Sequence, residues 1–118
     1  MFMHKIVIKQ APGAGPRRKL LLIPGFAGAS SSYFAMFKPL SEHFEITAFD
    51  MLGFACSGRP ELLTYDYEET IELLVLQMRV FLDTIGYEND KQSYSIAAHS
   101  MGCLIASHFT KRYPKYVD

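Results

Sequence analysis

Short, mainly apolar runs that each end in small or polar residues recur along the chain, and they constrain the fold more than any other feature. Leu20–Ile23, Glu45–Phe49 and Ser93–Ala98 are such runs, and a helical pattern follows each one. Continuous runs of this length are typical of strands covered on both faces. The alternation predicts an α/β fold, a parallel sheet with helices on both faces. In such a sheet the ligand crevice lies at the carboxyl ends of the strands.

The remaining elements fit the same alternation. Lys5–Lys9 is apolar in the middle and charged at both ends, and we expect it to form a short first strand. A helix is expected to begin at Tyr33 and to be interrupted or restarted at Pro39. The last helix is expected over Met101–Tyr113. The basic cluster Arg17–Lys19 is expected in a solvated loop, with phosphate contact as the alternative.

The longest helix is predicted between Asp66 and Gly86. Asp66 and Glu69 can form a reciprocal cap at its start, and Gly86 is expected to end it. Its apolar residues follow the i, i+3, i+4, i+7 spacing of one buried face: Ile71, Leu74, Val75, Met78, Phe81, Leu82 and Ile85.

Length and composition bound the class of protein. A chain of 118 residues makes at most one domain, and 49% hydrophobic with 20% charged residues predicts a globular core. Twelve basic residues balance twelve acidic ones, which removes any electrostatic case for a nucleic-acid partner. Cys56 and Cys103 lack metal-ligand spacing and are expected to be free thiols. No metal and no cofactor is expected.

The sequence also bears on location. Met1–Lys5 leads into a charged alternating segment rather than the apolar core of a signal peptide. No apolar run approaches the roughly 20 residues that span a bilayer, so no transmembrane segment is expected. A cytoplasmic protein is expected, and any contact with a lipid surface is expected to be peripheral.

The segment Ala98–Gly102 reads Ala-His-Ser-Met-Gly and joins the last strand to the last helix. It matches the G-x-S-x-G pattern of a nucleophile elbow, with Ala98 in place of the first glycine. Small residues on either side of Ser100 allow a corner so sharp that the serine takes a strained backbone conformation. The corner lifts the hydroxyl clear of the sheet, above the positive end of a helix. The alternative is an ordinary serine N-cap.

A dinucleotide-binding fold is a further alternative. Gly25–Gly28 opens a helix, and Asp50 ends the next strand about 20 residues on, where the ribose ligand of such a fold stands. The sequence lacks G-x-G-x-x-G, however, and no lysine follows the glycines as a P-loop requires. A hydrolase in which Ser100 is the nucleophile gives a role to each of the strand-to-helix turns. We therefore prefer this interpretation to a dinucleotide-binding fold.

Attack by Ser100 on an acyl carbonyl needs donors for the oxyanion of the tetrahedral intermediate. One donor is expected to be the backbone N–H of Met101, the residue after the nucleophile. The other is expected from the loop that follows Leu20–Ile23, at Phe26, with Ala27 beside it. A rigid loop serves because such donors need no reorientation during the reaction.

Three motifs in order resemble the α/β-hydrolase family over nearly the whole chain. Leu22–Phe26 resembles the oxyanion-loop motif H-G-F, Asp50–Pro60 the segment D-x-x-G-x-G-x-S, and Ala98–Gly102 the A-H-S-M-G elbow of some lipases. In detail, Asp50–Pro60 is most similar to the lipid-acting branch of lysophospholipid and N-acyl-phospholipid hydrolases, acyltransferases and lipase coactivators. The resemblance implies a serine hydrolase of carboxylic esters. The supporting positions that it implies are Gly25, Asp50, Ala98, His99 and Gly102.

Three positions depart from the family pattern. Pro24 stands where histidine is usual, which removes a side chain that organises the oxyanion loop. Ala55 replaces a glycine, so a positive φ there carries strain. Ala98 in place of glycine requires only that a methyl group fit against the neighbouring strand.

The triad of this fold runs Ser, then Asp or Glu, then His along the chain. After Ser100, only His108 and Asp118 have suitable chemistry. His108 lies about two turns along the same helix, over ~10 Å from the corner, and cannot reach the hydroxyl. The other candidates are expected to have structural roles, with His99 supporting the corner, Asp50 organising a loop, and His4 and His43 at the surface.

Residues 1–118 are therefore expected to form the amino-terminal part of one α/β-hydrolase domain, incomplete at its carboxyl end. The complete protein is expected to hydrolyse lipid-like carboxylic esters through an acyl-enzyme at Ser100. This chain, without a downstream acid and histidine, is expected to be inactive alone. The alternatives are an acyltransferase of the same fold and a catalytically inactive protein that binds a lipid or a partner. The expected ligand is a small-molecule acyl ester or lipid.

Overall fold

The computed structural model of the chain describes residues 2–61 and 64–118. Within these residues, four strands form one sheet in the order β1-β3-β2-β4. The strands are β1 (Lys5–Ile8), β2 (Lys19–Ile23), β3 (Glu45–Phe49) and β4 (Tyr94–Ala98). β2 pairs in parallel with β3 and β4, whereas β1 is antiparallel to β3. The segment 9–18 holds no helix to carry the chain over the sheet, so the chain reverses direction there and the sheet is mixed.

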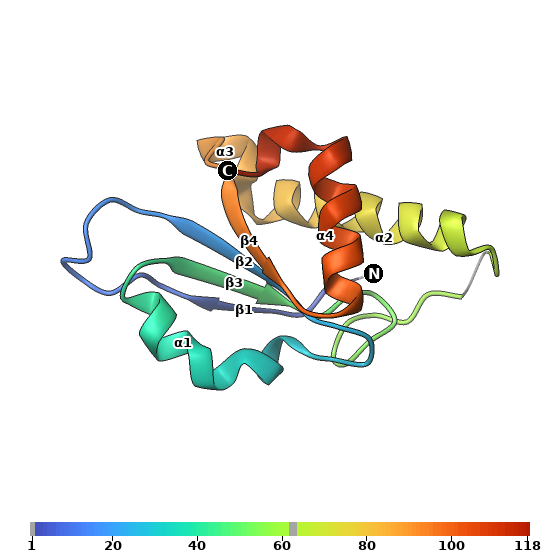
Figure 1. Cartoon of the computed structure of the whole chain (residues 1–118), viewed down its shortest axis with the longest axis horizontal. Helices are drawn as coiled ribbons and strands as arrows, with labels where there is room; N and C mark the ends of the chain where they lie inside the picture. Colours follow the sequence, from blue (N-terminus) through green and yellow to red (C-terminus); the bar gives the residue numbers. More distant parts are fainter. Residues whose placement is uncertain (1, 62–63) are drawn as a thin grey trace.

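Helices cover both faces of the sheet, as the alternation predicts (Figure 1). One face carries α1 (Phe34–Ser41), which follows the short turn η1 (Ser30–Tyr33). The other face carries α2 (Tyr67–Leu82) and α4 (Met101–Arg112). Short helical turns complete the chain at η2 (Asp83–Tyr87), α3 (Glu88–Asp90) and η3 (Pro114–Tyr116). The α/β class is confirmed. Among the described residues, no helix combines the length and the apolar character needed to cross a bilayer.

The sheet divides the hydrophobic core into two layers, one on each of its faces. Leu20 and Leu22 face α1, together with Ile46 and Ala48 of β3. Alternate side chains of the same strands face α2 and α4 in the larger layer, which includes Leu21, Ile23, Phe49, Val75, Met78, Leu82, Ile105 and Phe109. All five residues of β2 are buried, because each of its faces is covered by helices. Burial on both faces explains why Leu20–Ile23 is an uninterrupted apolar run in the sequence.

The long helix α2 begins after Asp66, whose carboxylate accepts a hydrogen bond of 2.9 Å from the Glu69 N–H. The expected return bond from Glu69 is absent among the described residues, because the Asp66 N–H donates to the Thr64 hydroxyl instead. Its regular part ends at Leu82, and the wider turn η2 that follows contains Gly86, whose φ of 120° breaks the helical backbone as expected. Five of the seven residues on the predicted face are buried, and the other two pack against the core. Pro39 does not interrupt α1 as expected, because only one backbone donor is lost near the end of this short helix.

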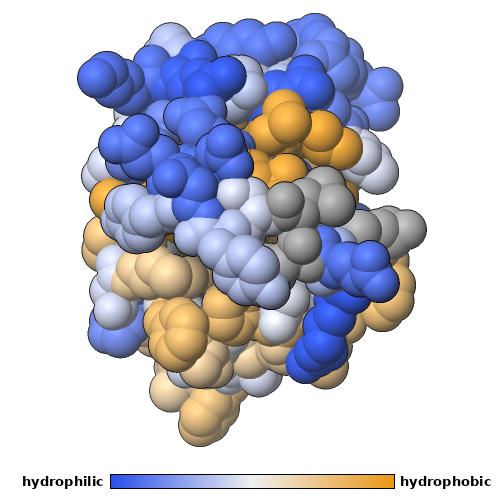
Figure 2. All heavy atoms as spheres, turned by 90° about the vertical axis from the view of Figure 1, so that its right-hand side faces the viewer, coloured by the Kyte–Doolittle hydropathy of each residue, from blue (hydrophilic) through white to orange (hydrophobic). Residues whose placement is uncertain are grey.

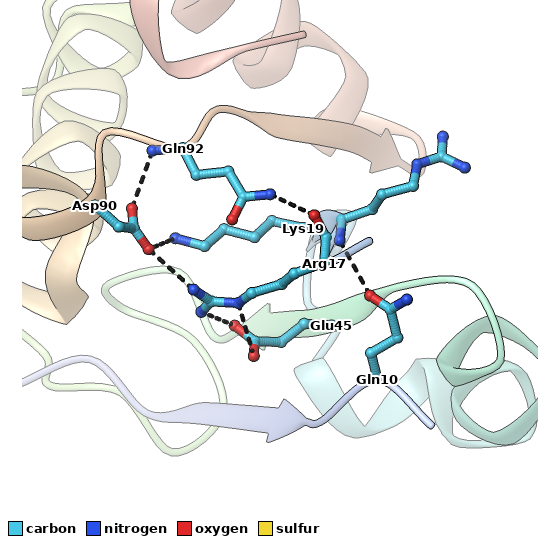
Figure 3. Close-up of polar contacts among 7 residues, drawn as sticks. Gln10, Arg17, Lys19, Glu45, Asp90 and Gln92 are labelled. Atoms are coloured by element: carbon cyan, nitrogen blue, oxygen red, sulfur yellow. Dashed lines mark hydrogen bonds and ion pairs between the residues drawn. The ribbon is translucent and has the colours of Figure 1, made fainter. Parts of the chain in front are cut away.

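An ion-pair network at the amino ends of the strands joins β2, β3 and α3 (Figure 3). The Lys19 ammonium lies 2.6 Å from Asp90 Oδ2, and its side chain is only 5% exposed. The Arg17 guanidinium binds both carboxylate oxygens of Glu45 and also contacts Asp90 at 3.2 Å. The expectation of a solvated basic loop is therefore wrong for Lys19. This residue begins β2, and its charge is buried against a partner. We call these four residues the amino-end network.

Candidate active site

Ser100 lies at the junction of β4 and α4, where the chain turns sharply. Its backbone angles are φ 54° and ψ −122°, and such sparsely populated conformations cost a non-glycine residue on the order of 1–3 kcal/mol. The residue is exposed, and its side chain makes no hydrogen bond that caps α4. An ordinary serine N-cap has extended backbone angles and bonds a nearby helical N–H. The turn at Ser100 is therefore not a cap of that kind.

Two glycines allow neighbouring backbone to approach this turn closely. A Cβ on Gly102 would lie 2.6 Å from the carbonyl oxygen of Pro24 and 2.7 Å from that of Ile23. A Cβ on Gly25 would lie 3.1 Å from the Cβ of Ser100. Because these distances are shorter than van der Waals contact, only glycine fits at either position without a shift of its neighbours. The loop after β2 therefore lies directly against the serine.

Ala98 and His99 lead the chain into the turn. Ala98 stands opposite Ile23 in the parallel ladder between β4 and β2. The His99 N–H donates to the carbonyl oxygen of Ile23 at 3.2 Å. His99 Nδ1 would lie 3.0 Å from a Cβ on Gly25, so the imidazole rests against the loop after β2. The predicted positions around Ser100 are thus brought together in space.

The loop after β2 also carries Phe26, one of the two expected oxyanion donors. Phe26 is 73% exposed, and its ring meets that of Phe54 edge to face with centroids 5.6 Å apart. Ala27 takes a φ of 55°, which fixes a tight turn. Neither the Phe26 nor the Met101 N–H donates a hydrogen bond to any residue in the described part of the chain. The role of these two groups as oxyanion donors stays a prediction.

A cleft of about 460 Å³ opens beside this loop, on the side of α1. The Tyr33 hydroxyl forms part of its wall and donates a hydrogen bond of 2.7 Å to the carbonyl oxygen of Ile23. Burial, with a smaller effect from Cys103, raises the pKa of Tyr33, so the phenol stays protonated as a donor. The cleft has the size of a small-molecule site. Its lining residues are Pro24, Gly25, Phe26, Ala27, Gly28, Ser32, Tyr33, Met36 and His99.

Asp50, at the end of β3, organises the neighbouring loops. Its side chain is 1% exposed and accepts hydrogen bonds from the Ser30 N–H at 2.6 Å and the Cys56 N–H at 3.1 Å. His4 Nδ1 lies 3.0 Å from the same carboxylate. Burial alone raises the pKa of Asp50, but these hydrogen bonds and the nearby His4 outweigh it and hold that pKa below its ordinary value. The carboxylate therefore ties three segments together in its ionised form.

The other candidate acids and bases lie elsewhere. His108 is exposed on α4 and lines a groove with Tyr67 of α2. His43 is exposed between α1 and β3, and the Asp118 N–H donates to the carbonyl oxygen of Tyr94, at the amino end of β4. No hydrogen bond joins Ser100 to a histidine in residues 2–61 and 64–118. The described part of the chain supplies the predicted nucleophile without a base.

Two features near the site differ from the sequence-based expectations or go beyond them. The His4 side chain is 41% exposed, in line with the expected surface position, but it also contacts Asp50, because β1 pairs with β3 and brings the two residues together. Tyr33 was expected only as the start of a helix, yet it forms a wall of the cleft. An aromatic residue a few positions after a glycine-rich loop is a weak signal for such a role. The expected strain at Ala55 is present, with φ 43°.

Comparisons with known proteins agree with the fold. Residues 19–118 match the model of the alpha/beta hydrolase fold family. The chain is 35% identical over 97 residues to the probable lysophospholipase BODYGUARD 5 of Arabidopsis thaliana, covering 76% of this chain and 20% of that protein. It is 26% identical over 102 residues to a 1-acylglycerol-3-phosphate O-acyltransferase of the same plant, covering 84% of this chain and 23% of that protein. The resemblance to the lipid-acting branch is thus confirmed.

A solved structure supports the fold. An epoxide hydrolase from Bacillus megaterium superposes with a TM-score of 0.77 at 28% identity, over 98% of this chain and 36% of that one. The chain therefore spans less than a quarter of the length of the two curated relatives and about a third of the solved structure.

Proposed function

Because the chain belongs to the α/β-hydrolase-fold family, we propose that Ser100 is the nucleophile of a hydrolase that acts on lipid-like carboxylic esters. The observation that carries the proposal is the backbone of this residue, which is exposed at φ 54° and ψ −122° without capping α4. A strained serine at a strand-to-helix turn suits a nucleophile elbow. The same strain gives no advantage to a serine that only begins a helix.

The proposed reaction has two steps. The Ser100 Oγ bonds to the ester carbonyl carbon, the carbonyl oxygen becomes an oxyanion, and the alcohol leaves with the serine proton, which a general base transfers. Water then attacks the acyl-enzyme and releases the acid. The N–H groups of Phe26 and Met101 are assigned to the oxyanion, since neither donates a hydrogen bond within the described residues, Met101 follows Ser100 directly, and Gly25, beside Phe26, lies against Ser100. The base and its acid are assigned to residues outside this chain.

The surroundings of Ser100 support an apolar acyl group as substrate. Figure 2 shows the molecule from the side on which β2, β3 and β4 end. Apolar side chains gather over the lower part of this view, which is formed by α1 and by the loop after β2. Phe26, Phe34 and Met36 are exposed in this region, at 73%, 75% and 45%. A mostly apolar cleft with a few polar groups is the usual form of a site for an apolar ligand. The relatives named for lysophospholipid and acylglycerol chemistry point in the same direction.

Acyl transfer is a second candidate, favoured by the match to an acyltransferase. It uses the same acyl-enzyme, and an alcohol of a second lipid takes the place of water. A third candidate is binding of a lipid without catalysis. The replacement of the family's histidine by Pro24 and the lack of a described base for Ser100 favour that candidate.

A serine-reactive fluorophosphonate tests the proposal. The protein made from its natural gene is treated with the probe, and the adduct is mapped by mass spectrometry. We expect labelling at Ser100, loss of label in Ser100→Ala, and no loss in Ser107→Ala, which removes another exposed serine of the same helix. Absence of label at Ser100 would favour the binding protein. The 118-residue chain alone is expected to show no turnover.

A lysophospholipid substrate with a labelled acyl group separates the two catalytic candidates. Release of the labelled fatty acid in water supports hydrolysis. Transfer of the label to an added lysophosphatidic acid, at the expense of free fatty acid, supports the acyltransferase.

A further inference from the structure

Three side chains with metal-binding donors converge at the corner where β1 and β3 meet the loop after β3. They are His4, Asp50 and Cys56, and their donor atoms all lie within 4.8 Å of one another. The three residues come from separate parts of the sequence, so their spacing along the chain does not reveal them.

The fold fixes the first two donors firmly. The Asp50 N–H donates to the carbonyl oxygen of His4 at 3.0 Å, which extends the antiparallel ladder by one step. His4 Nδ1 consequently lies 3.0 Å from Asp50 Oδ2. The Ser57 hydroxyl accepts from the His4 N–H at 2.9 Å and donates to the Asp50 carbonyl oxygen at 2.6 Å. Backbone and side chain of both residues are therefore held in place before any ligand arrives.

The third donor is held through its backbone and is open to solvent through its side chain. The Cys56 N–H donates to Asp50 Oδ2 at 3.1 Å, which anchors the loop beside the carboxylate. The Cys56 thiol is free and the residue is exposed. An ion can enter from solvent on that side, and the thiol can move to meet it.

The donor set has the chemistry of a zinc site. Imidazole nitrogen, carboxylate oxygen and thiolate sulfur are the three side-chain ligands that Zn²⁺ takes in proteins. A carboxylate and a thiolate balance the two charges of the ion. Zinc–ligand distances of about 2.0–2.3 Å place tetrahedral donors roughly 3.3–3.8 Å apart. Because the three donor atoms lie no more than 4.8 Å apart, a movement of at most roughly 1.5 Å completes the site, and the exposed thiol is free to make it.

We propose that His4, Asp50 and Cys56 bind one Zn²⁺ ion, with a water molecule as the fourth ligand. On binding, the Cys56 sulfur loses its proton to solvent and bonds to the metal, and the metal takes the place of the His4–Asp50 hydrogen bond. The ion joins the amino end of β1 to the loop after β3. This site is independent of the chemistry assigned to Ser100.

Cobalt serves as the spectroscopic probe for the zinc site. Co²⁺ is titrated into the reduced 118-residue chain, and the near-ultraviolet thiolate-to-cobalt charge-transfer band is recorded, with Zn²⁺ added afterwards to displace it. We expect one equivalent of Co²⁺ to bind. We expect Cys56→Ala to abolish the band and to weaken Zn²⁺ binding at least about 10-fold, the lower end of what a lost supporting contact costs a metal site. Cys103→Ala, at the other exposed thiol, is expected to bind as the wild type does.

A pair of histidine variants tests the second ligand. His4→Ala is expected to weaken Zn²⁺ binding by a similar factor, whereas His43→Ala, at an exposed histidine away from the corner, leaves it unchanged. Circular dichroism checks that each variant is folded. The proposal is overturned if no thiolate band forms, if the band survives Cys56→Ala, or if folded His4→Ala binds Zn²⁺ as tightly as the wild type.

Discussion

Gly102 lies so close to Pro24 that a Cβ on the glycine would be 2.6 Å from the proline carbonyl oxygen. The first turn of α4 therefore rests directly on the backbone at the end of β2. This contact holds the turn at Ser100 against the loop that carries Phe26. The small residue two positions after the serine is required by packing.

The first prediction concerns Gly102→Ala. The added methyl group meets two carbonyl oxygens of the backbone, which cannot move aside as a flexible side chain can. We expect the free energy of unfolding to fall by about 2 kcal/mol or more, because overpacking a rigid contact costs about 1–3 kcal/mol. Urea denaturation measures the change. The matched control is Ser107→Ala on the exposed face of α4, which is expected to change stability by no more than about 0.5 kcal/mol. Equal stabilities for the two variants would contradict the close contact.

The second prediction concerns the strain at Ser100. Glycine adopts a positive φ at little cost, so Ser100→Gly is expected to raise the free energy of unfolding by up to about 1 kcal/mol. The same change at Ser107, inside the regular part of α4, is expected to lower it by roughly 0.5–1 kcal/mol. Thermal or urea unfolding of both variants shows whether each substitution raises or lowers the free energy of unfolding. A loss of stability in Ser100→Gly equal to that in Ser107→Gly would show that the turn stores no strain.

The third prediction concerns Asp50, whose pKa in the folded protein is held below its ordinary value by hydrogen bonds that outweigh the effect of burial. A carboxyl group with a lowered folded pKa contributes stability above its unfolded pKa of about 4, and this contribution is lost as the pH falls through the folded value. Asp50→Asn is expected to lower the free energy of unfolding at pH 7 by about 1–3 kcal/mol, because an amide leaves buried donors unpaired.

The pH dependence provides the check on this carboxylate. The free energies of unfolding of the wild type and of Asp50→Asn are expected to differ most at pH 7. This difference is expected to become smaller below about pH 4, when the wild-type carboxylate takes up its proton. Asp66→Asn is the control, since asparagine caps a helix as well as aspartate does. A constant difference across the pH range would exclude the charge of Asp50 as the cause.

The fourth prediction compares two cations of the amino-end network. The Lys19 side chain is 5% exposed and that of Arg17 is 50% exposed, although both contact Asp90. Lys19→Met is expected to lower the free energy of unfolding by about 1.5–3 kcal/mol, the value of a shielded hydrogen bond to a charged group. Arg17→Met is expected to cost less than about 1 kcal/mol, as exposed ion pairs do. The reverse order, measured by urea denaturation, would contradict the burial of the Lys19 pair.

The sequence predicts the parts of the fold that depend on local pattern. The boundaries of β3 agree to the residue, and α2 buries the face that its apolar spacing indicates. The pattern does not predict the burial of Lys19, because its partner Asp90 lies 71 residues away in the chain. The direction of β1 also depends on a distant strand, β3, and the position of His4 follows from that pairing.

In the candidate site, too, the sequence predicts the features that depend on local pattern and misses those that depend on contacts between distant segments. Motif spacing predicts the backbone turn at Ser100, since small residues and a strand-to-helix junction are local features. It does not predict the contribution of Tyr33 to the cleft or the meeting of Cys56 with His4, because each depends on packing between separate segments. The roles of Phe26 and Met101 as oxyanion donors are still predictions, since they concern a reaction intermediate.

The placement of the amino-end network has a consequence for how this protein can change. Its charges sit at one end of the strands, while the unfavourable backbone angles of Ser100, Ala55 and Ala27 sit at the other. Substitutions that strengthen the ion pairs at the charged end can therefore offset the conformational cost at the other end without altering the shape of the cleft. The loops beside the cleft can then be varied while the far end of the sheet compensates for the stability that such changes cost.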